Sequence, residues 1–243
     1  LAGVIRRQIR QAGAAPDDRT VLVETFIDPA GETGLAVLTP FGHRLHHALK
    51  LVLSARLRER LGIEVASLHG DDGILFRLPG MDEPPMDVFA GVTADLALDL
   101  IRRDLADSPL FGLRFRQNAG RALLMPRPDP SKRTPLWLQR LRAKDLLQAV
   151  RKFPDFPIVV ETYRECLDDD LDLPSLRAFL DAVQSGSIRV ATHRGQVSSP
   201  FTSELIFAFS LKFLYEWDEP VRPAVERSGP IVDEADLDPL LDP

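Results

Sequence analysis

Short runs of β-branched and other apolar residues, separated by turn formers, mark the first part of the chain and predict strands. The β-branched run from Thr20 to Ile27, the turn formers of 29–34 and the run from Leu35 to Thr39 predict a hairpin. A second hairpin is predicted for 63–68 and 73–78, because Asp71-Asp72-Gly73 between them is a turn sequence. Between the hairpins, apolar residues at helical spacing predict an amphipathic helix from His43 to Leu61, with basic residues on its other face and Gly62 as its stop.

Helical periodicity dominates the later part. Val88, Val92, Leu96 and Leu100 recur every four residues and predict a helix running to about Leu105. Other elements predicted by pattern are helices over 4–12, 110–125, 136–150, 158–167 and 173–183, a strand over 187–192, and a buried helix or strand over 204–214. The proline-rich stretch 126–130 cannot continue a helix. The fold class indicated is α+β, a mixed domain with an early β-sheet or hairpin portion and a later helix-rich portion.

The same pattern suggests three segments. Residues 1–12 have the character of the end of a connecting helix from a preceding domain, and the sequence before Val4 has neither an initiator Met nor a signal-peptide layout. Residues 13–220 are expected to form a single domain. Residues 221–243 are acidic and proline-containing, and a surface tail is expected there. No apolar run is long enough for a transmembrane helix, and the single cysteine excludes an internal disulfide, which fits a cytoplasmic protein.

Charge is distributed very unevenly. The net charge is −6, yet residues 114–152 hold eleven basic and two acidic residues, whereas 153–243 hold eighteen acidic and seven basic ones. A local basic face can bind a polyanion even when the total charge is negative. The alternative is that the basic and acidic stretches pair with each other inside one fold. The charges alone leave both interpretations open.

Several kinds of chemistry are not indicated. The sequence has no phosphate-binding loop of the G-x-x-x-x-G-K-[ST] type, no G-x-G-x-x-G after a strand, and no cysteine and histidine set at zinc spacing. His43 lies one helical turn from His46 and His47, but partly exposed polar positions are the commoner reason for such histidines, and no metal site is expected. Asp168-Asp169-Asp170 is interpreted as closing one helix and capping the next, and Cys166 as a small core residue. No catalytic residue is predicted.

Short strings rich in arginine and tryptophan recur in a fixed order across the chain. The main ones are Ser108–Arg116, Ala119–Arg127, Arg133–Leu147, Phe156-Pro-Ile, Glu161–Leu167, Ser199-Pro-Phe201 and Tyr215–Pro220, preceded by Val21–Glu24, Pro40-Phe-Gly with Arg44 and His46, and Asp71–Pro79. From about residue 4 to about residue 240, this succession resembles the region after the winged helix in Lhr-type (large helicase-related) superfamily 2 DNA helicases.

The resemblance implies an accessory domain at the end of a helicase core. In that family two motor domains hydrolyse ATP and move 3′ to 5′ on single-stranded DNA, while a winged helix and this last domain complete the channel. Partners would be single-stranded DNA or a DNA–RNA hybrid together with the motor and winged-helix domains, and no membrane is implied. ATP and Mg²⁺ would serve the parent helicase, with no cofactor in this chain.

Binding to nucleic acid would fall mainly to cations spaced along a strand, because arginine forks fit phosphate oxygens. The candidate nucleic-acid-binding residues are Arg44, His46, Lys50, Arg114, Arg116, Arg121, Arg127, Lys132, Arg133, Trp137, Arg140 and Lys144. About half of the arginines are expected to be structural, with Glu161, Arg164 and Glu165 forming buried ion pairs with Arg116 or Arg140.

One departure from the family pattern concerns base stacking. Many members carry an aromatic residue shortly after the Phe-Gly-x-Arg-x-His string, whereas this chain has Ala48-Leu49-Lys50 there. Trp137 is the nearest aromatic residue in a basic context, and core packing of its helix is the competing interpretation.

Two other functions remain open. A DNA glycosylase-like domain that handles flipped bases would need a poised carboxylate, for which Glu161, Asp71 and Asp72 are the candidates. A protein-interaction module would use the acidic end of the chain, residues 216–243.

Overall fold

The computed structural model describes residues 2–28, 31–126, 135–153 and 155–207, which divide into two compact units. Among the described residues, the first unit comprises 2–97 and 174–207, and the second comprises 98–173. The proline-rich loop expected at 126–130 lies mostly outside the described residues, as do the later part of the 204–214 segment and the acidic tail. The predicted domain boundaries at residues 12 and 220 remain predictions.

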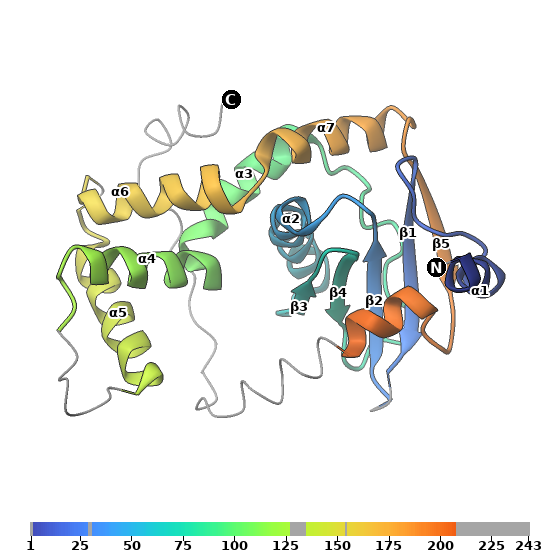
Figure 1. The fold of residues 1–243 in the computed structure, drawn as a ribbon, viewed down its shortest axis with the longest axis horizontal. Coiled ribbons are helices and arrows are strands. Elements are labelled where there is room, and N and C mark those ends of the chain that lie inside the picture. The colour runs from blue at the N-terminus through green and yellow to red at the C-terminus, as the bar shows by residue number, and fades with distance from the viewer. Residues whose placement is uncertain (1, 29–30, 127–134, 154, 208–243) are drawn as a thin grey trace. The chain divides into compact units, whose positions relative to one another are not determined.

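A five-stranded sheet forms the centre of the first unit (Figure 1). Its strands are β1 (Thr20–Ile27), β2 (Thr33–Leu38), β3 (Ala66–His69), β4 (Gly73–Arg77) and β5 (Arg189–Arg194), in the order β3-β4-β2-β1-β5. β1 and β2 form the first predicted hairpin, and β3 and β4 form the second. β5 pairs with β1 in parallel, opposite Thr20 to Thr25, after a connection that includes the whole second unit.

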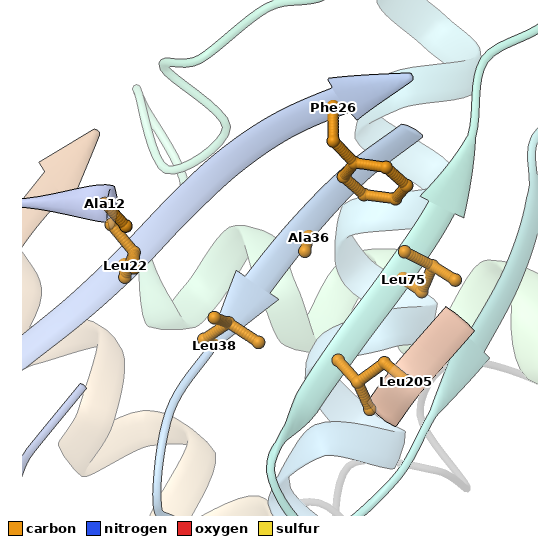
Figure 2. Close-up of a cluster of buried hydrophobic side chains, with 7 residues drawn as sticks. All are labelled: Ala12, Leu22, Phe26, Ala36, Leu38, Leu75 and Leu205. Carbon is orange, nitrogen blue, oxygen red and sulfur yellow. The ribbon is translucent and has the colours of Figure 1, made fainter. Parts of the chain in front are cut away.

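The central strands β1, β2 and β4 are buried on both faces, whereas the edge strands β3 and β5 are partly exposed. On one face a cluster of side chains packs beneath α1 (Ala2–Ala12) and the helix at 200–207, the orange helix that crosses in front of β1 and β2 in Figure 1. Figure 2 shows this cluster, which consists of Ala12, Leu22, Phe26, Ala36, Leu38, Leu75 and Leu205. Since side chains alternate along a strand, Val21, Val23 and Val37, which are also buried, point to the other face.

The helix α2 (His43–Leu61) contacts β3 and β4 and has the bounds predicted from the sequence. Its apolar stripe, which includes Leu45, Leu49 and Val52, is fully or almost fully buried. Gly62 ends the helix in the left-handed conformation (φ 69°), and its N–H donates to the carbonyl oxygen of Arg58 at 2.8 Å.

Helices make up the second unit. Its elements are the larger part of α3 (Ala94–Asp104), the 3₁₀ turn η1 (Leu105–Asp107), α4 (Pro109–Arg121), α5 (Leu136–Val150), α6 (Pro157–Arg164) and the π-helical turn η2 (Glu165–Asp170). α4 contacts α5, α6 and η2 and so forms the centre of the unit. The chain then returns to the first unit in α7 (Leu173–Gln184).

The predicted α+β class, with strands early and helices later, is confirmed. One helix boundary was wrong. The helix predicted from Val88 begins at Ala94, because the Thr93 hydroxyl accepts from the Leu96 N–H at 3.1 Å and Gly91 before it has φ 70°. Val88 and Val92 are buried in the turn before the helix, so their helical spacing in the sequence does not correspond to a helix. In the described part of the chain, no helix is both long and apolar enough to span a membrane.

Candidate nucleic-acid interface

The residues predicted to bind nucleic acid are divided between the two units. Arg44, His46 and Lys50 lie on α2 in the first unit, and the others that the structure describes lie on α4 and α5 in the second. Arg127, Lys132 and Arg133 fall outside the described residues, so their role stays a prediction.

Two of the predicted cations, Arg44 and Lys50, lie in the first half of α2. Arg44 is exposed and Lys50 is half-buried. Further along the helix the basic side chains form ion pairs on the protein itself, which are Arg56 with Glu59 at 3.1 Å, Arg58 with Glu64 at 3.9 Å and Arg60 with Asp87 at 3.0 Å. The basic face predicted for this helix is therefore partly neutralised at its C-terminal end.

His46 is fully buried. Its Nδ1 lies 2.7 Å from the carbonyl oxygen of Gly70 and its Nε2 lies 2.5 Å from the Thr39 hydroxyl. Since a carbonyl oxygen can only accept, Nδ1 donates to it and Nε2 accepts from Thr39. Burial lowers the pKa of His46, although the bond to Gly70 and the charges of Asp72 and Asp71 act the other way. In this arrangement His46 fastens the β3–β4 turn to α2 and offers no ring nitrogen to a ligand in solvent.

Arg114 on α4 makes a two-pronged ion pair with Asp170 at the end of η2, with Nε and Nη2 each 2.5 Å from a carboxylate oxygen. The bond to Asp170 raises the pKa of Arg114, so the guanidinium stays charged at any ordinary pH. Both partners are largely buried, and Asp170 supports α4 from the acid-rich stretch. Arg114 is thereby a structural arginine.

Arg121 also binds an acid. Its Nη2 contacts the Glu165 carboxylate and the Asn118 side-chain oxygen, and the Asn118 amide donates to the Thr162 hydroxyl at 3.1 Å. This network joins α4 to α6 and η2. Sequence reasoning had placed Glu165 opposite Arg116 or Arg140, and that pairing was wrong, because the acid lies at the C-terminal end of α4. Arg121 and Glu165 are 44 positions apart in the sequence, and Arg114 and Asp170 are 56 apart, so no local sequence pattern indicates these pairings.

The like charges of Arg116 and Arg140 act on each other. They come from the packed helices α4 and α5, and burial together with the charge of Arg140 lowers the pKa of Arg116. Within the part of the chain that the structure describes, no ion pair to an acid is recorded for Arg116. Lys144 lies one turn beyond Arg140 and is exposed, as is Arg142, which sequence reasoning left out of the site. The two helices therefore present a group of cations suited to an anionic ligand.

Trp137 lies in the first turn of α5 and 51% of its surface is exposed. Leu136 beside it and Leu141 one turn later are exposed to a similar extent, at 52% and 47%. The alternative interpretation, in which Trp137 packs into the core around its helix, does not agree with this exposure. An exposed indole next to a group of cations is what stacking on a nucleobase requires.

Residues 15–202 match the protein family described as DEAD/H associated. The chain belongs to the DEAD/H-associated family. A solved structure that is similar to it is that of Mycobacterium smegmatis helicase Lhr bound to ssDNA and AMP-PNP, with a TM-score of 0.77 and 41% sequence identity, over 84% of this chain and 26% of that one.

The relatives of this DEAD/H-associated chain include several Lhr helicases. It is 41% identical over 91% of its length to the Lhr helicase/probable uracil glycosylase of Mycolicibacterium smegmatis, and 35% identical over 91% to the Lhr helicase/uracil glycosylase of Escherichia coli. It is 26% identical over 84% to the ATP-dependent helicase Lhr-Core of Saccharolobus solfataricus. The chain spans 15%, 14% and 24% of these relatives, respectively. The predicted resemblance to Lhr-type helicases is confirmed.

Proposed function

We propose that this chain is an accessory nucleic-acid-binding domain of an ATP-dependent 3′–5′ DNA helicase, and that it grips single-stranded DNA or a DNA–RNA hybrid. The contacts are made by Arg116, Arg140 and Lys144, with Trp137 as a stacking platform. Arg44 and Lys50 on α2 contribute a second group of cations from the other unit. Arg127, Lys132 and Arg133 belong to the same proposed set by sequence.

The observation that carries this proposal is that Arg116 and Arg140 come from two helices packed against each other, α4 and α5, and that burial and the charge of Arg140 lower the pKa of Arg116. Two guanidinium groups that repel each other in a partly buried setting cost free energy in the absence of an anion. A phosphate oxygen between them removes that repulsion and accepts hydrogen bonds from both forks. Arg114 and Arg121 on α4 each form an ion pair with an acid on η2, whereas Arg116 has no recorded ion pair to an acid among the described residues.

Binding of this kind gives affinity without sequence preference, because phosphates carry no base information. An accessory domain of a helicase that moves along DNA needs this lack of sequence preference, since it must let DNA of every sequence pass. A stacked Trp137 is compatible with it, because every base offers a π-face. The similar Mycobacterium smegmatis helicase Lhr was solved bound to single-stranded DNA, which supports this choice of ligand.

ATP and Mg²⁺ enter the proposal as ligands of other parts of the helicase. The chain has no phosphate-binding loop sequence. The names of the similar archaeal proteins include ATP-dependent helicase, and in all of them the chain matches only part of the length. Energy from hydrolysis would therefore reach this domain through the neighbouring motor and winged-helix domains.

The proposal is tested by fluorescence anisotropy with labelled single-stranded DNA, duplex DNA and a DNA–RNA hybrid of equal length. We expect the 243-residue chain to bind the single strand or the hybrid weakly and to lose affinity steeply from low to moderate salt, with a slope of about −0.7 per phosphate contacted on a single strand. Equal affinity at all salt concentrations, or preference for plain duplex, would contradict it. The matched control is Arg164→Ala on α6, which removes an exposed cation outside the proposed set.

The glycosylase-like alternative has a specific motive in the names of the two bacterial relatives, although the chain covers only about a seventh of each. Its candidate carboxylates are all exposed. Asp71 and Asp72 are exposed in the β3–β4 turn, and Glu161 is exposed on α6. Incubation of the chain with uracil-containing single-stranded and duplex DNA, followed by alkaline cleavage, decides the matter, and we expect no strand breakage.

A further inference from the structure

Three histidines of the first unit meet at one end of α2. His43 and His47 are one helical turn apart on α2, and His69 is the last residue of β3. The ring of His69 lies between the other two, with its centroid 4.4 Å from that of His43 and 4.2 Å from that of His47. Each ring offers a nitrogen atom such that all three nitrogens lie within 4.8 Å of one another. The sequence spacing indicated only that histidines of the predicted helix lie one turn apart. His69 joins them through the pairing of β3 with β4, which the spacing does not show.

We propose that His43, His47 and His69 form a zinc-binding site, with three neutral imidazoles and a water molecule as the fourth ligand. Zinc–nitrogen bonds of about 2.0–2.1 Å in a tetrahedron place the nitrogens about 3.4 Å apart. Modest rotations of these rings about their side-chain torsions close the difference from 4.8 Å. His47 and His69 are half-buried, whereas His43 is exposed, so the fourth position would open to solvent on the side of His43.

The backbone around this site is held in place without a metal. His46, between the two helical ligands, donates from Nδ1 to the carbonyl oxygen of Gly70, which follows His69 directly. Further along the same two elements the hydroxyls of Ser54 and Ser67 lie 3.2 Å apart. These two links fix β3 against α2 on either side of the histidines. The ligands are thus supported by a preformed frame, which reduces the ordering that metal binding would otherwise require.

Two carboxylates, those of Asp71 and Asp72, lie exposed in the turn that follows His69. The single cysteine, Cys166, is buried in the other unit. A set of imidazoles with an open position suits zinc better than magnesium or calcium, which prefer oxygen ligands. Zinc would tie the first turn of α2 to the end of β3.

The test uses the 243-residue chain without a histidine tag, stripped with EDTA and titrated with ZnCl₂ by calorimetry. We expect one zinc ion per chain, and a loss of affinity of more than about 100-fold in His47→Ala and in His69→Ala, because removing a ligand costs more than removing a supporting residue. His193→Ala is the matched control, since His193 lies on β5 of the same unit outside the cluster, and it should bind zinc like the natural chain. Co²⁺ should give the strong visible bands of a tetrahedral site in the natural chain and in His193→Ala alone.

Loss of folding is separated from loss of a ligand by thermal unfolding. In EDTA, His69→Asn should unfold at the same temperature as the natural chain, and added zinc should raise the midpoint of the natural chain only. Absence of zinc binding by the natural chain overturns the proposal. Binding that is unchanged in both His47→Ala and His69→Ala overturns it as well.

Discussion

The side chain of Glu24, fully buried on β1, accepts a hydrogen bond from the backbone N–H of Ser199 at 2.6 Å. The second carboxylate oxygen accepts from the Thr202 hydroxyl at 3.2 Å. The carboxylate thus lies at the N-terminus of the helix at 200–207, where N–H groups lack partners within the helix and negative charge is favoured. This contact joins the Val21–Glu24 string to the Ser199-Pro-Phe201 string, although Glu24 and Ser199 are 175 positions apart in the sequence.

Replacing Glu24 by Ala should therefore destabilise the chain by about 2–4 kcal/mol, because the Ser199 N–H and the Thr202 hydroxyl would be left buried without their acceptor. Glu24→Gln keeps one acceptor oxygen and should cost less. Urea unfolding followed by circular dichroism measures both. An alanine variant as stable as the natural chain would show that the contact contributes nothing.

The ion pair between Arg114 and Asp170 leads to a second prediction. Asp170→Ala leaves a largely buried guanidinium without its carboxylate and should cost about 1–3 kcal/mol of the free energy of unfolding. Asp170→Asn should cost less, and Arg114→Lys should be intermediate because an ammonium cannot form the two-pronged contact. Unfolding in urea tests the series. Asp168→Ala is the control, since Asp168 is exposed and its ion pair with Arg164, at 4.0 Å, joins two residues one helical turn apart.

Cys166 should be chemically inert in the folded chain. Its side chain is fully buried, and burial, followed by the charge of Asp170, raises the pKa of the thiol above its usual range. The reactive thiolate is therefore not populated at neutral pH. We expect iodoacetamide to label the native chain very slowly and the urea-unfolded chain completely. Equal rates in the two states would show that the region around η2 opens readily.

Trp137 provides a test of base stacking. Trp137→Ala should weaken single-stranded DNA binding by about 5- to 150-fold, which corresponds to about 1–3 kcal/mol for one stacked base. Trp137→Phe should retain much of the affinity, because a smaller ring still stacks. Phe153→Ala, which removes an aromatic residue that is 54% exposed in the same unit, is the control and should bind normally. If both alanine variants bind like the natural chain, the indole has no part in the interface.

The local structure was largely predictable from the sequence. The helix His43–Leu61 was placed to the residue, because Gly42 and Gly62 bound an uninterrupted apolar stripe. The hairpin β3–β4 followed from its turn sequence. The N-terminus of α3 was misplaced, since the capping hydroxyl of Thr93 outweighs an apolar spacing that continues before it.

Long-range pairing was not predictable. The sequence around β5 does not indicate that this strand pairs in parallel with β1, because strand pairing depends on how whole elements pack. The same holds for the candidate site. Its cations were identified by composition, but only the fold distinguishes Arg114 and Arg121, which bind acids, from Arg116, whose pKa is lowered by burial and by the charge of Arg140.

The salt dependence of single-stranded DNA binding by the double variant Arg116→Ala/Arg140→Ala is the most direct test of the proposed grip. The control Arg164→Ala/Arg189→Ala removes the same number of charges elsewhere. We expect the first double variant to bind more weakly and to show a salt slope shallower by about 1.4, as two lost phosphate contacts require, with the control close to the natural chain. Equal slopes and affinities for both double variants would contradict the proposal that α4 and α5 hold the strand.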